Sequence, residues 1–456
     1  MSTCPHSCQP ASRSLICVEV LSGQRCMSVR LNWIGVLATG ATVLAGCGGG
    51  GGSSSASSSS STPIINTLAA TVDGGPSAIV QVDGIIPNFL YASVTICVPG
   101  STSNCQTIDH VQIDTASVGL RIMGSLLDST LLSALKQPTT SGGQPVFECV
   151  PFADGYSWGP LSTVDIQFTS DEKASSVPIQ IIEDPTSVNI PAVPTDCQTA
   201  AGANVAENTP AALGANGVLG VSALLQDCGS ACVSATVAGS YYSCTSATSS
   251  GTCTDITMRL ADQVQNPVAL IAGTDNNGVA IQLPAVNPPG AVSASGTLYF
   301  GVGTQSNNPL GAATIFQLDS EYGEYIDTQF AGTDLPYSLL DMGTNFYAFN
   351  SSITQCTDLT GFYCPASTTA LTATIQGQSA VGSPTGTQVS VGFDIGNADS
   401  LLPQNATNAA LPTLGGTGTT GSFDWGLPFF YGRTLYVVFE ERSVSGSSQA
   451  GPYMAF

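Results

Sequence analysis

Short apolar segments separated by turn residues recur along the chain from about residue 64 to its end. Val164–Phe168 alternates apolar with polar residues, which predicts a strand of an antiparallel sheet with one buried face. Residues 296–303 and 434–440 are predicted as further strands, and Leu126–Lys136 has the pattern of a short helix. This pattern predicts a mostly β protein.

One pair of apolar runs suggests a hairpin. Residues 268–272 and 279–283 flank the segment Gly-Thr-Asp-Asn-Asn-Gly. Asn277 and Gly278 at its end are residues that tolerate the positive φ of a tight hairpin turn. We therefore expect these two runs to pair with each other as strands.

The composition supports strands and excludes some functions. The chain has 456 residues with 50 Gly and 27 Pro, and 9% of its residues are charged. Abundant small and β-branched residues, with little Lys or Glu, favour strands and turns over helices. The 31 acids and 9 bases give a net charge of −22, which cannot neutralise phosphates and excludes a nucleic-acid partner.

The N-terminal region has the pattern of an export signal. Arg30, an apolar run and small residues over 27–46 form this signal, and the sequence Leu-Ala-Gly-Cys ending at Cys47 resembles a bacterial lipobox, which implies a lipidated cysteine. A lone cysteine behind an ordinary cleaved signal is the alternative. The Gly- and Ser-rich segment that follows Cys47 suits a tether, so 47–63 is predicted as lipidated cysteine and linker. Residues 1–26 are interpreted as an upstream extension from a misassigned start.

Removal of residues 1–46 leaves 30 acids and 6 bases, a net charge of −24. His110 is then the single histidine, which argues against a histidine-rich metal site and against histidine-based nucleophilic catalysis. No metal and no cofactor are expected. Chemistry in this chain would have to use carboxyl groups.

Ten cysteines remain in the predicted mature chain, an even number that suits disulfides in an exported protein. Near neighbours suggest four local bridges, and the remaining two cysteines would form the long-range one. A zinc site at Cys228 and Cys232 is the less favoured alternative, because no histidine accompanies them. The expected pairs are Cys97 with Cys105, Cys149 with Cys197, Cys228 with Cys232, Cys244 with Cys253, and Cys356 with Cys364.

Two aspartates follow similar apolar strands. Asp114 lies in Val-Gln-Ile-Asp-Thr-Ala-Ser, and Asp341 lies in Leu-Leu-Asp-Met-Gly-Thr. If the fold brings them together, the two carboxyl groups would share one proton, so that one activates water while the other polarises a carbonyl. Two unrelated turn residues are the alternative, since Asp before a small residue is common in turns.

Five segments in order resemble the pepsin-like aspartic peptidases. The two aspartate loops are similar to that family's active-site loops, with Thr115, Ser117, Gly343 and Thr344 as supporting residues. Residues 152–168 are similar to its flap, for which Phe152, Gly155 and Tyr156 are the candidates. Residues 215–222 and 423–441 are similar to the elements that follow each loop. The chain also resembles a bacterial lipoprotein family of unknown function.

This resemblance implies a bilobal β fold with a cleft between the lobes. The lobes would be residues 64–296, with a Cys-rich insertion near 225–255, and residues 297–456. Each lobe would contribute one catalytic aspartate, and a flap would close over a peptide or protein substrate.

The departures from the family pattern bear on activity. Ala116 replaces a glycine, and its methyl group is expected to disturb a tight turn. Met342 replaces a threonine, so half of a hydrogen-bonded brace between the two loops is expected to be lost while Thr115 keeps the other half. Phe152 lacks a flap hydroxyl. Arg121 replaces a tryptophan, and is expected either to pair with the dyad or to be a solvated strand residue.

Two functions follow from these features. The first is an aspartic endopeptidase tethered by its lipid to the cell envelope, at the outer membrane. The second is an inactive descendant that binds a peptide or an envelope partner. An unrelated β lipoprotein is a third alternative. Trp158, Tyr156 and Trp425 are weak candidates for a sugar-binding surface, and a core position is the favoured interpretation for them.

Overall fold

The computed structural model describes residues 65–80, 85–200, 205–404 and 407–456. The predicted signal peptide, Cys47 and the linker lie outside the described residues. Among the residues described, no helix combines the length and apolar character needed to cross a membrane.

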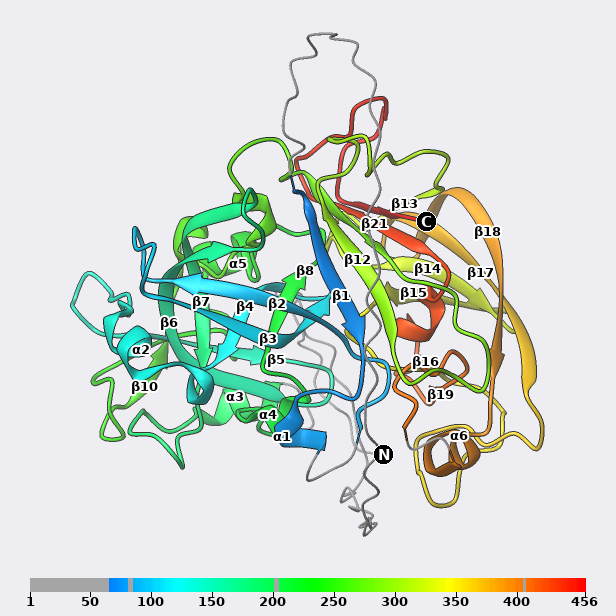
Figure 1. Cartoon of the computed structure of the whole chain (residues 1–456), viewed down its shortest axis with the longest axis horizontal. Helices are drawn as coiled ribbons and strands as arrows, with labels where there is room; N and C mark the ends of the chain where they lie inside the picture. The colour runs from blue at the N-terminus through cyan, green and yellow to red at the C-terminus, as the bar shows by residue number, and fades with distance from the viewer. Residues whose placement is uncertain (1–64, 81–84, 201–204, 405–406) are drawn as a thin grey trace, which may run out of the picture.

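The structure is mostly β, which confirms the predicted fold class. Strands β2 to β10 gather on one side of the molecule and β14 to β19 on the other, with β1, β12 and β21 between them (Figure 1). This arrangement is consistent with the bilobal fold that the resemblance implies. The predicted lobe boundary near residue 296 falls within β12.

The larger sheet has fifteen strands in the order β10-β9-β5-β6-β7-β4-β8-β3-β2-β1-β12-β11-β21-β22-β13. β1 lies between β2 and β12, and the C-terminal strands β21 and β22 lie near one edge of the sheet. Its strands are β1 Thr67–Val72, β2 Leu90–Cys97, β3 Cys105–Asp114, β4 Val118–Met123, β5 Val146–Pro151, β6 Tyr156–Gln167, β7 Lys173–Ile182, β8 Gly217–Val221, β9 Tyr241–Cys244, β10 Cys253–Asp255, β11 Gly278–Gln282, β12 Ala294–Phe300, β13 Ile315–Gln317, β21 Thr434–Val438 and β22 Tyr453–Ala455.

The smaller sheet has seven strands in the order β18-β17-β14-β15-β20-β16-β19. They are β14 Ile326–Phe330, β15 Thr333–Leu340, β16 Tyr347–Phe349, β17 Thr369–Ala380, β18 Ser383–Ile395, β19 Gly415–Gly416 and β20 Phe423–Trp425. The helices are short: α1 Ser77–Val80, α2 Ser129–Ala134, α3 Thr195–Ala200, α4 Pro210–Leu213, α5 Gly229–Ser234 and α6 Ala398–Gln404, with 3-10 turns η1 Gly124–Leu126, η2 Leu260–Asp262, η3 Val268–Leu270 and η4 Leu427–Phe430.

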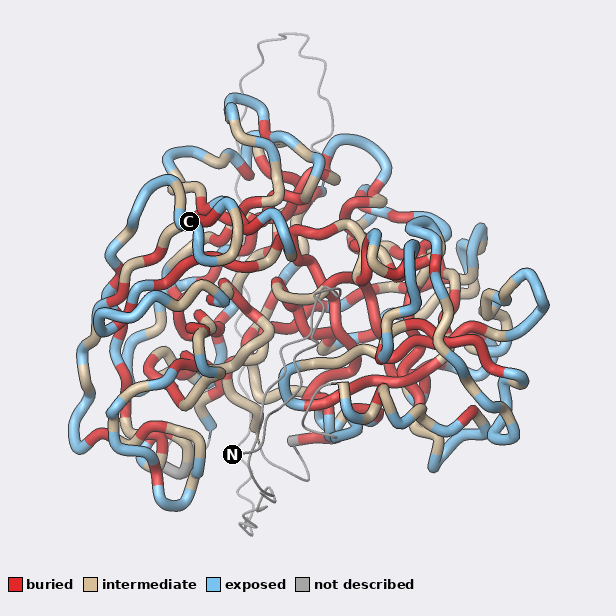
Figure 2. The backbone as a smooth tube through the Cα atoms, turned by 180° about the vertical axis from the view of Figure 1, so that it is seen from behind, coloured by how far each residue is buried: buried red, intermediate tan, exposed pale blue. Residues whose placement is uncertain are grey.

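A single large apolar cluster runs through both sides of the molecule. Buried backbone is concentrated in the strands, while the loops around them are exposed (Figure 2). Val164 and Ile166 of β6 and Phe168 just after it are buried, and the residues between them are only partly buried, as the alternation predicts. The strands predicted at 296–303 and 434–440 correspond to β12 and β21. The predicted helix is shorter than expected, since only η1 and α2 form there.

The predicted hairpin at 268–283 is wrong. Val268–Leu270 is a 3-10 turn whose Val268 N–H donates to Asn266 Oδ1 at 3.1 Å, and Ile271 pairs with Ala174 of β7. β11 pairs instead with β12 and β21. Asn277 has no positive φ, and its side chain bonds the backbone of Val302. Long-range partners therefore outcompete the local pairing.

The ten cysteines form the five predicted disulfides. Cys149–Cys197 is the one that spans the longest stretch of chain, and it ties β5 to α3. Cys228 and Cys232 are bonded to each other, so the zinc alternative is excluded for them. The disulfide Cys356–Cys364 likewise makes its sulfurs unsuitable as metal ligands beside Asp399.

Candidate active site

Each predicted aspartate stands at the end of a strand that has a parallel neighbour. Asp114 ends β3, which runs parallel to β8, and Asp114 lies opposite Gly220. Asp341 follows β15, which runs parallel to β20, and its N–H donates to the carbonyl of Trp425 at 3.1 Å. The two loops therefore share one local construction, and both aspartate side chains are buried.

The fold brings the two carboxyl groups together around Gly343. A Cβ added to Gly343 would lie 2.6 Å from Asp114 Oδ1 and 3.0 Å from Asp341 Oδ1. The two oxygens are therefore at most about 5.6 Å apart, which is the sum of those distances. Glycine is required at this position because any side chain would displace a carboxyl group. Sequence reasoning selected both aspartates and this glycine.

Each loop holds its own carboxylate by a short backbone turn. The N–H of Ala116 donates to Asp114 Oδ1 at 2.8 Å, and the N–H of Gly343 donates to Asp341 Oδ1 at 2.6 Å. Ala116 is not among the residues with a left-handed backbone. The expected disturbance of the first turn by its methyl group is therefore not seen in the hydrogen bonding.

The next residue in each loop behaves differently. Thr344 Oγ1 lies 2.9 Å from Asp341 Oδ2, as predicted for a supporting hydroxyl. The buried Ser117 hydroxyl has no hydrogen-bond partner within the described part of the chain, so it does not support a carboxylate in the way that Thr344 does.

The neighbouring strands explain this asymmetry. Ile113, just before Asp114, pairs with Leu219 of β8, and Leu340, just before Asp341, pairs with Trp425 of β20. Val218 precedes Leu219 and Asp424 precedes Trp425, so Val218 and Asp424 occupy equivalent positions beside the two loops. Beside the first loop that position is apolar and offers Ser117 nothing to bond. Beside the second loop, Asp424 Oδ2 lies 2.8 Å from Thr344 Oγ1.

Asp424 is thus a third acid at the site, and sequence reasoning missed it. A hydroxyl donates one hydrogen bond, so Thr344 bonds both Asp341 and Asp424 only if one of those two carboxyl groups is protonated. Burial raises the pKa of Asp424 to about 7. Burial and the negative charges of Asp424 and Asp114 raise the pKa of Asp341 well above its usual range. The signal available in the sequence was an acid within the apolar run Phe423–Phe430.

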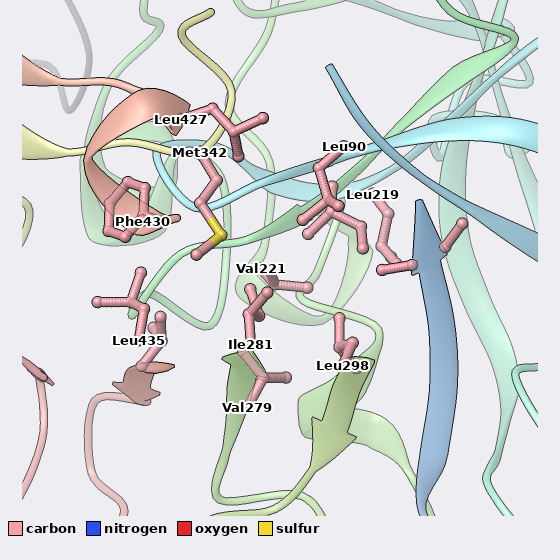
Figure 3. Packing of buried hydrophobic residues seen from close by; sticks show 14 of the residues in the cluster. Leu90, Leu219, Val221, Val279, Ile281, Leu298, Met342, Leu427, Phe430 and Leu435 are labelled. Carbon is pink, nitrogen blue, oxygen red and sulfur yellow. The ribbon is translucent and has the colours of Figure 1, made fainter. Parts of the chain in front are cut away.

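A hydrogen-bonded brace joins the two loops through Thr115. Its buried hydroxyl donates to the carbonyl of Leu340 at 2.9 Å and accepts from the N–H of Met342 at 2.9 Å. The equivalent half from the second loop is missing, because Met342 has no hydroxyl. Its side chain packs instead among apolar residues such as Val221, Leu427 and Phe430 (Figure 3).

Arg121 neither pairs with the dyad nor lies in solvent, so both expectations for it are wrong. Its side chain is 1% exposed, and its Nη2 lies 3.1 Å from Glu148 Oε1 and 3.4 Å from Asp227 Oδ2. Tyr241 donates to Asp227 at 2.6 Å. This buried cluster joins β4 to the flap strand β5 and to the Cys-rich insertion.

The predicted flap is a hairpin between β5 and β6 whose turn is closed by the Phe152 N–H, which donates to Gly155 at 2.7 Å. It is held on both edges. β5 pairs with β9, and Tyr156 exchanges backbone hydrogen bonds with Val205 and Glu207. Phe152 packs against an apolar cluster that includes Val218. The hairpin is therefore a part of a larger sheet.

The remaining candidates lie elsewhere. Trp158 and Trp425 are fully buried and Tyr156 is 6% exposed, which confirms a core position over a sugar-binding surface. His110 Nε2 lies 3.4 Å from Asp73 Oδ1, and hydrogen bonding to Asp73 raises the pKa of His110. His110 is therefore a partly buried residue of the first lobe that pairs with Asp73.

The chain belongs to the family of proteins of unknown function designated DUF3443, whose model matches residues 62–456. No curated protein matches it. Among solved structures, an aspartic proteinase from Irpex lacteus is similar, with a TM-score of 0.44 and 16% sequence identity over 85% of this chain and 96% of that one. The assignment of the candidate site is based on the distances and hydrogen bonds within this chain.

Proposed function

We propose that this chain is an aspartic peptidase of the cell envelope that hydrolyses peptide bonds with water activated by Asp114 and Asp341. The observation that carries the proposal is the convergence of both carboxyl groups on Gly343. Each is fixed by a backbone N–H, and both are buried. Two carboxyl groups at close range favour sharing one proton over carrying two full charges.

The chemistry of such a pair needs one proton. The ionised carboxyl group takes a proton from water as the oxygen attacks the peptide carbonyl, and the protonated carboxyl group donates to the carbonyl oxygen. Burial and the nearby acids raise the pKa of Asp341, which supports retention of that proton above the usual titration range of an aspartate. Activity should be lost as pH rises and the pair loses its proton.

An inactive peptide-binding protein is the second candidate. Three observations favour it: the unpartnered Ser117 hydroxyl, the missing half of the brace at Met342, and the flap hairpin held on both edges. Each departs from what a mobile, symmetric peptidase site would need. The same residues would then form a binding surface for a peptide or an envelope partner.

Cleavage of an unfolded polypeptide in water enriched in oxygen-18 tests the proposal. Incubation between about pH 3 and 8 should give new carboxyl termini that carry the heavy oxygen, with the highest rate in acid. A rate that rises toward alkaline pH would contradict the dyad. Peptide binding without cleavage at any pH would favour the second candidate.

The envelope location is a further part of the proposal. The lipobox-like sequence at Cys47 supports a lipid anchor, and the residue that follows it, Gly48, favours the outer membrane by analogy. Metabolic labelling with a fatty acid in a bacterial host should mark the wild-type chain and leave Cys47→Ser unlabelled. Equal labelling of both chains would rule out this anchor.

A further inference from the structure

The segment Ile85–Phe89, called the strap below, is bonded to both sides of the site. On one side it reaches the second lobe through Asn88, whose side chain is fully buried. The Asn88 N–H donates to the carbonyl of Ala409 at 2.6 Å, and Tyr431 donates to Asn88 Oδ1 at 2.8 Å. Asn88 Nδ2 donates to the carbonyls of Asn345 at 2.9 Å and Leu411 at 3.0 Å, and the Leu411 N–H returns a bond to Oδ1 at 2.7 Å.

This contact uses all the hydrogen-bonding capacity of the amide, which is two donors and two acceptor positions. Asn88 has a φ of 58°, in the left-handed region that asparagine tolerates better than most residues. A residue held in this conformation with every polar atom satisfied is fixed by the surrounding structure. The strap is therefore a built contact between the lobes.

On its other side the strap packs on the first lobe. A Cβ added to Gly214 would lie 3.1 Å from both Ile86 Cδ1 and Phe89 Cε1, so the glycine allows the close approach. Phe89 stacks on Tyr91 with ring centroids 6.0 Å apart. Phe89 packs against the same apolar cluster as Phe152 of the flap hairpin.

The strap also touches the loop that carries Asp341. Asn345 follows Thr344, whose hydroxyl bonds Asp341, and the Asn345 side chain donates to the carbonyl of Pro87 at 3.3 Å. The strap therefore joins the two lobes at Asn345, four residues along the chain from Asp341.

We propose that the strap determines specificity by closing one side of the site, so that only bonds near a free polypeptide end reach the dyad. This inference rests on the proposed peptidase function and narrows it from internal bonds in general to bonds near a chain end. A chain without an end, such as a cyclic peptide, is excluded. A variant with a loosened strap should allow a cyclic peptide to reach the dyad.

A linear peptide and its head-to-tail cyclic form test this proposal. The wild-type chain should cleave the linear form at least about tenfold faster, since the strap acts as a closed gate. Asn88→Gly keeps the left-handed backbone and removes all side-chain bonds, and it should raise cleavage of the cyclic form about tenfold with less than threefold change for the linear form. Tyr431→Phe removes one of those bonds and should give a smaller change in the same direction.

The matched control is Ser176→Gly, which removes the side chain of an exposed residue with a φ of 55° that is remote from the second lobe. It should leave the ratio of the two rates unchanged. A variant that loses stability while keeping the wild-type ratio would show that the strap is only a structural link. Equal cleavage of both forms by the wild-type chain would overturn the proposal.

Failure of the proposed peptidase function can be distinguished from failure of the strap proposal. If the wild-type chain cleaves neither peptide, binding of fluorescently labelled linear and cyclic forms tests the strap by itself. Binding of the linear form alone, with the cyclic form admitted by Asn88→Gly, would support the strap while refuting catalysis. Equal binding of both forms, or binding of neither, would refute the strap together with catalysis.

Discussion

Replacing Asp341 by asparagine is expected to lower kcat/KM for peptide cleavage by about a thousandfold, and Asp114→Asn should have an effect of the same order. Asparagine keeps the shape of the side chain and can still accept the N–H of Gly343. It cannot exchange a proton with water. The loss should therefore be in kcat, with KM changed little, and is measured from initial rates at the pH of highest activity.

The folded state of Asp341→Asn can be checked independently through its pH dependence. A carboxyl group whose pKa is raised by burial stabilises the folded chain below its unfolded pKa of about 4, and this contribution is lost as pH rises toward the folded pKa. The variant has no such loss. It should match the wild-type stability in acid and exceed it at neutral pH, as measured by urea unfolding.

Asp334→Asn is the matched control, because Asp334 is an exposed acid on β15, the strand that ends just before Asp341. The charge change is the same, but activity should stay within about twofold of wild type, as for surface substitutions remote from a site. Cleavage that survives in both dyad variants would refute the dyad. A similar loss in Asp334→Asn would indicate a general effect of net charge.

Local sequence patterns predicted the features that depend on nearby residues. The disulfides within short segments, the alternating strand at Val164–Phe168, and the two aspartate loops were all visible in this way. Each loop requires only a strand, an aspartate and a small residue that fits the turn. The brace at Thr115 could also be predicted, because the family resemblance implies that the hydroxyl of one aspartate loop bonds the other loop.

The features that were missed depend on partners far along the chain. Asp424 meets Thr344 across 80 residues, and Asn88 meets Leu411 across 323. The failed hairpin at 268–283 has the same cause, since Ile271 pairs with β7 rather than with its neighbour in sequence. A pattern confined to one segment contains no information about such partners.

Ser117 and Thr344 make the same point at closer range. Both are hydroxyl residues three positions after an aspartate, and the sequence gives no reason to treat them differently. The distinction arises from Val218 and Asp424 on the adjacent parallel strands. The protonation of the site therefore depends on a residue outside both aspartate loops.

Arg121→Met is expected to lower the free energy of unfolding by about 3–5 kcal/mol, the usual cost of removing one partner of a buried ion pair. Arg121 and Glu148 are each 1% exposed, and Asp227 is partly buried beside them. Without the guanidinium, two carboxyl groups remain close together with no counter-charge. Methionine fills most of the volume, so the cost reflects charge more than a cavity.

The pH dependence and two further variants make this prediction specific. Burial already raises the pKa of Glu148 well above its usual value, and the positive charge of Arg121 opposes that rise. In Arg121→Met the folded pKa of Glu148 should rise further, so the destabilisation should be small in acid, where Glu148 is protonated in both states, and grow as pH rises to neutral. Arg121→Met combined with Glu148→Gln should recover much of the stability at neutral pH, because the buried charge is removed.

The control is Arg259→Met, which breaks an exposed pair with Asp262 in which Arg259 is 83% exposed. Its effect should be about 0.5 kcal/mol or less, as for other surface ion pairs. Equal, small effects of Arg121→Met and Arg259→Met in urea unfolding would show that the buried cluster has no net role in stability. A large effect of Arg121→Met that did not change with pH would point to lost packing rather than to the charge of Glu148.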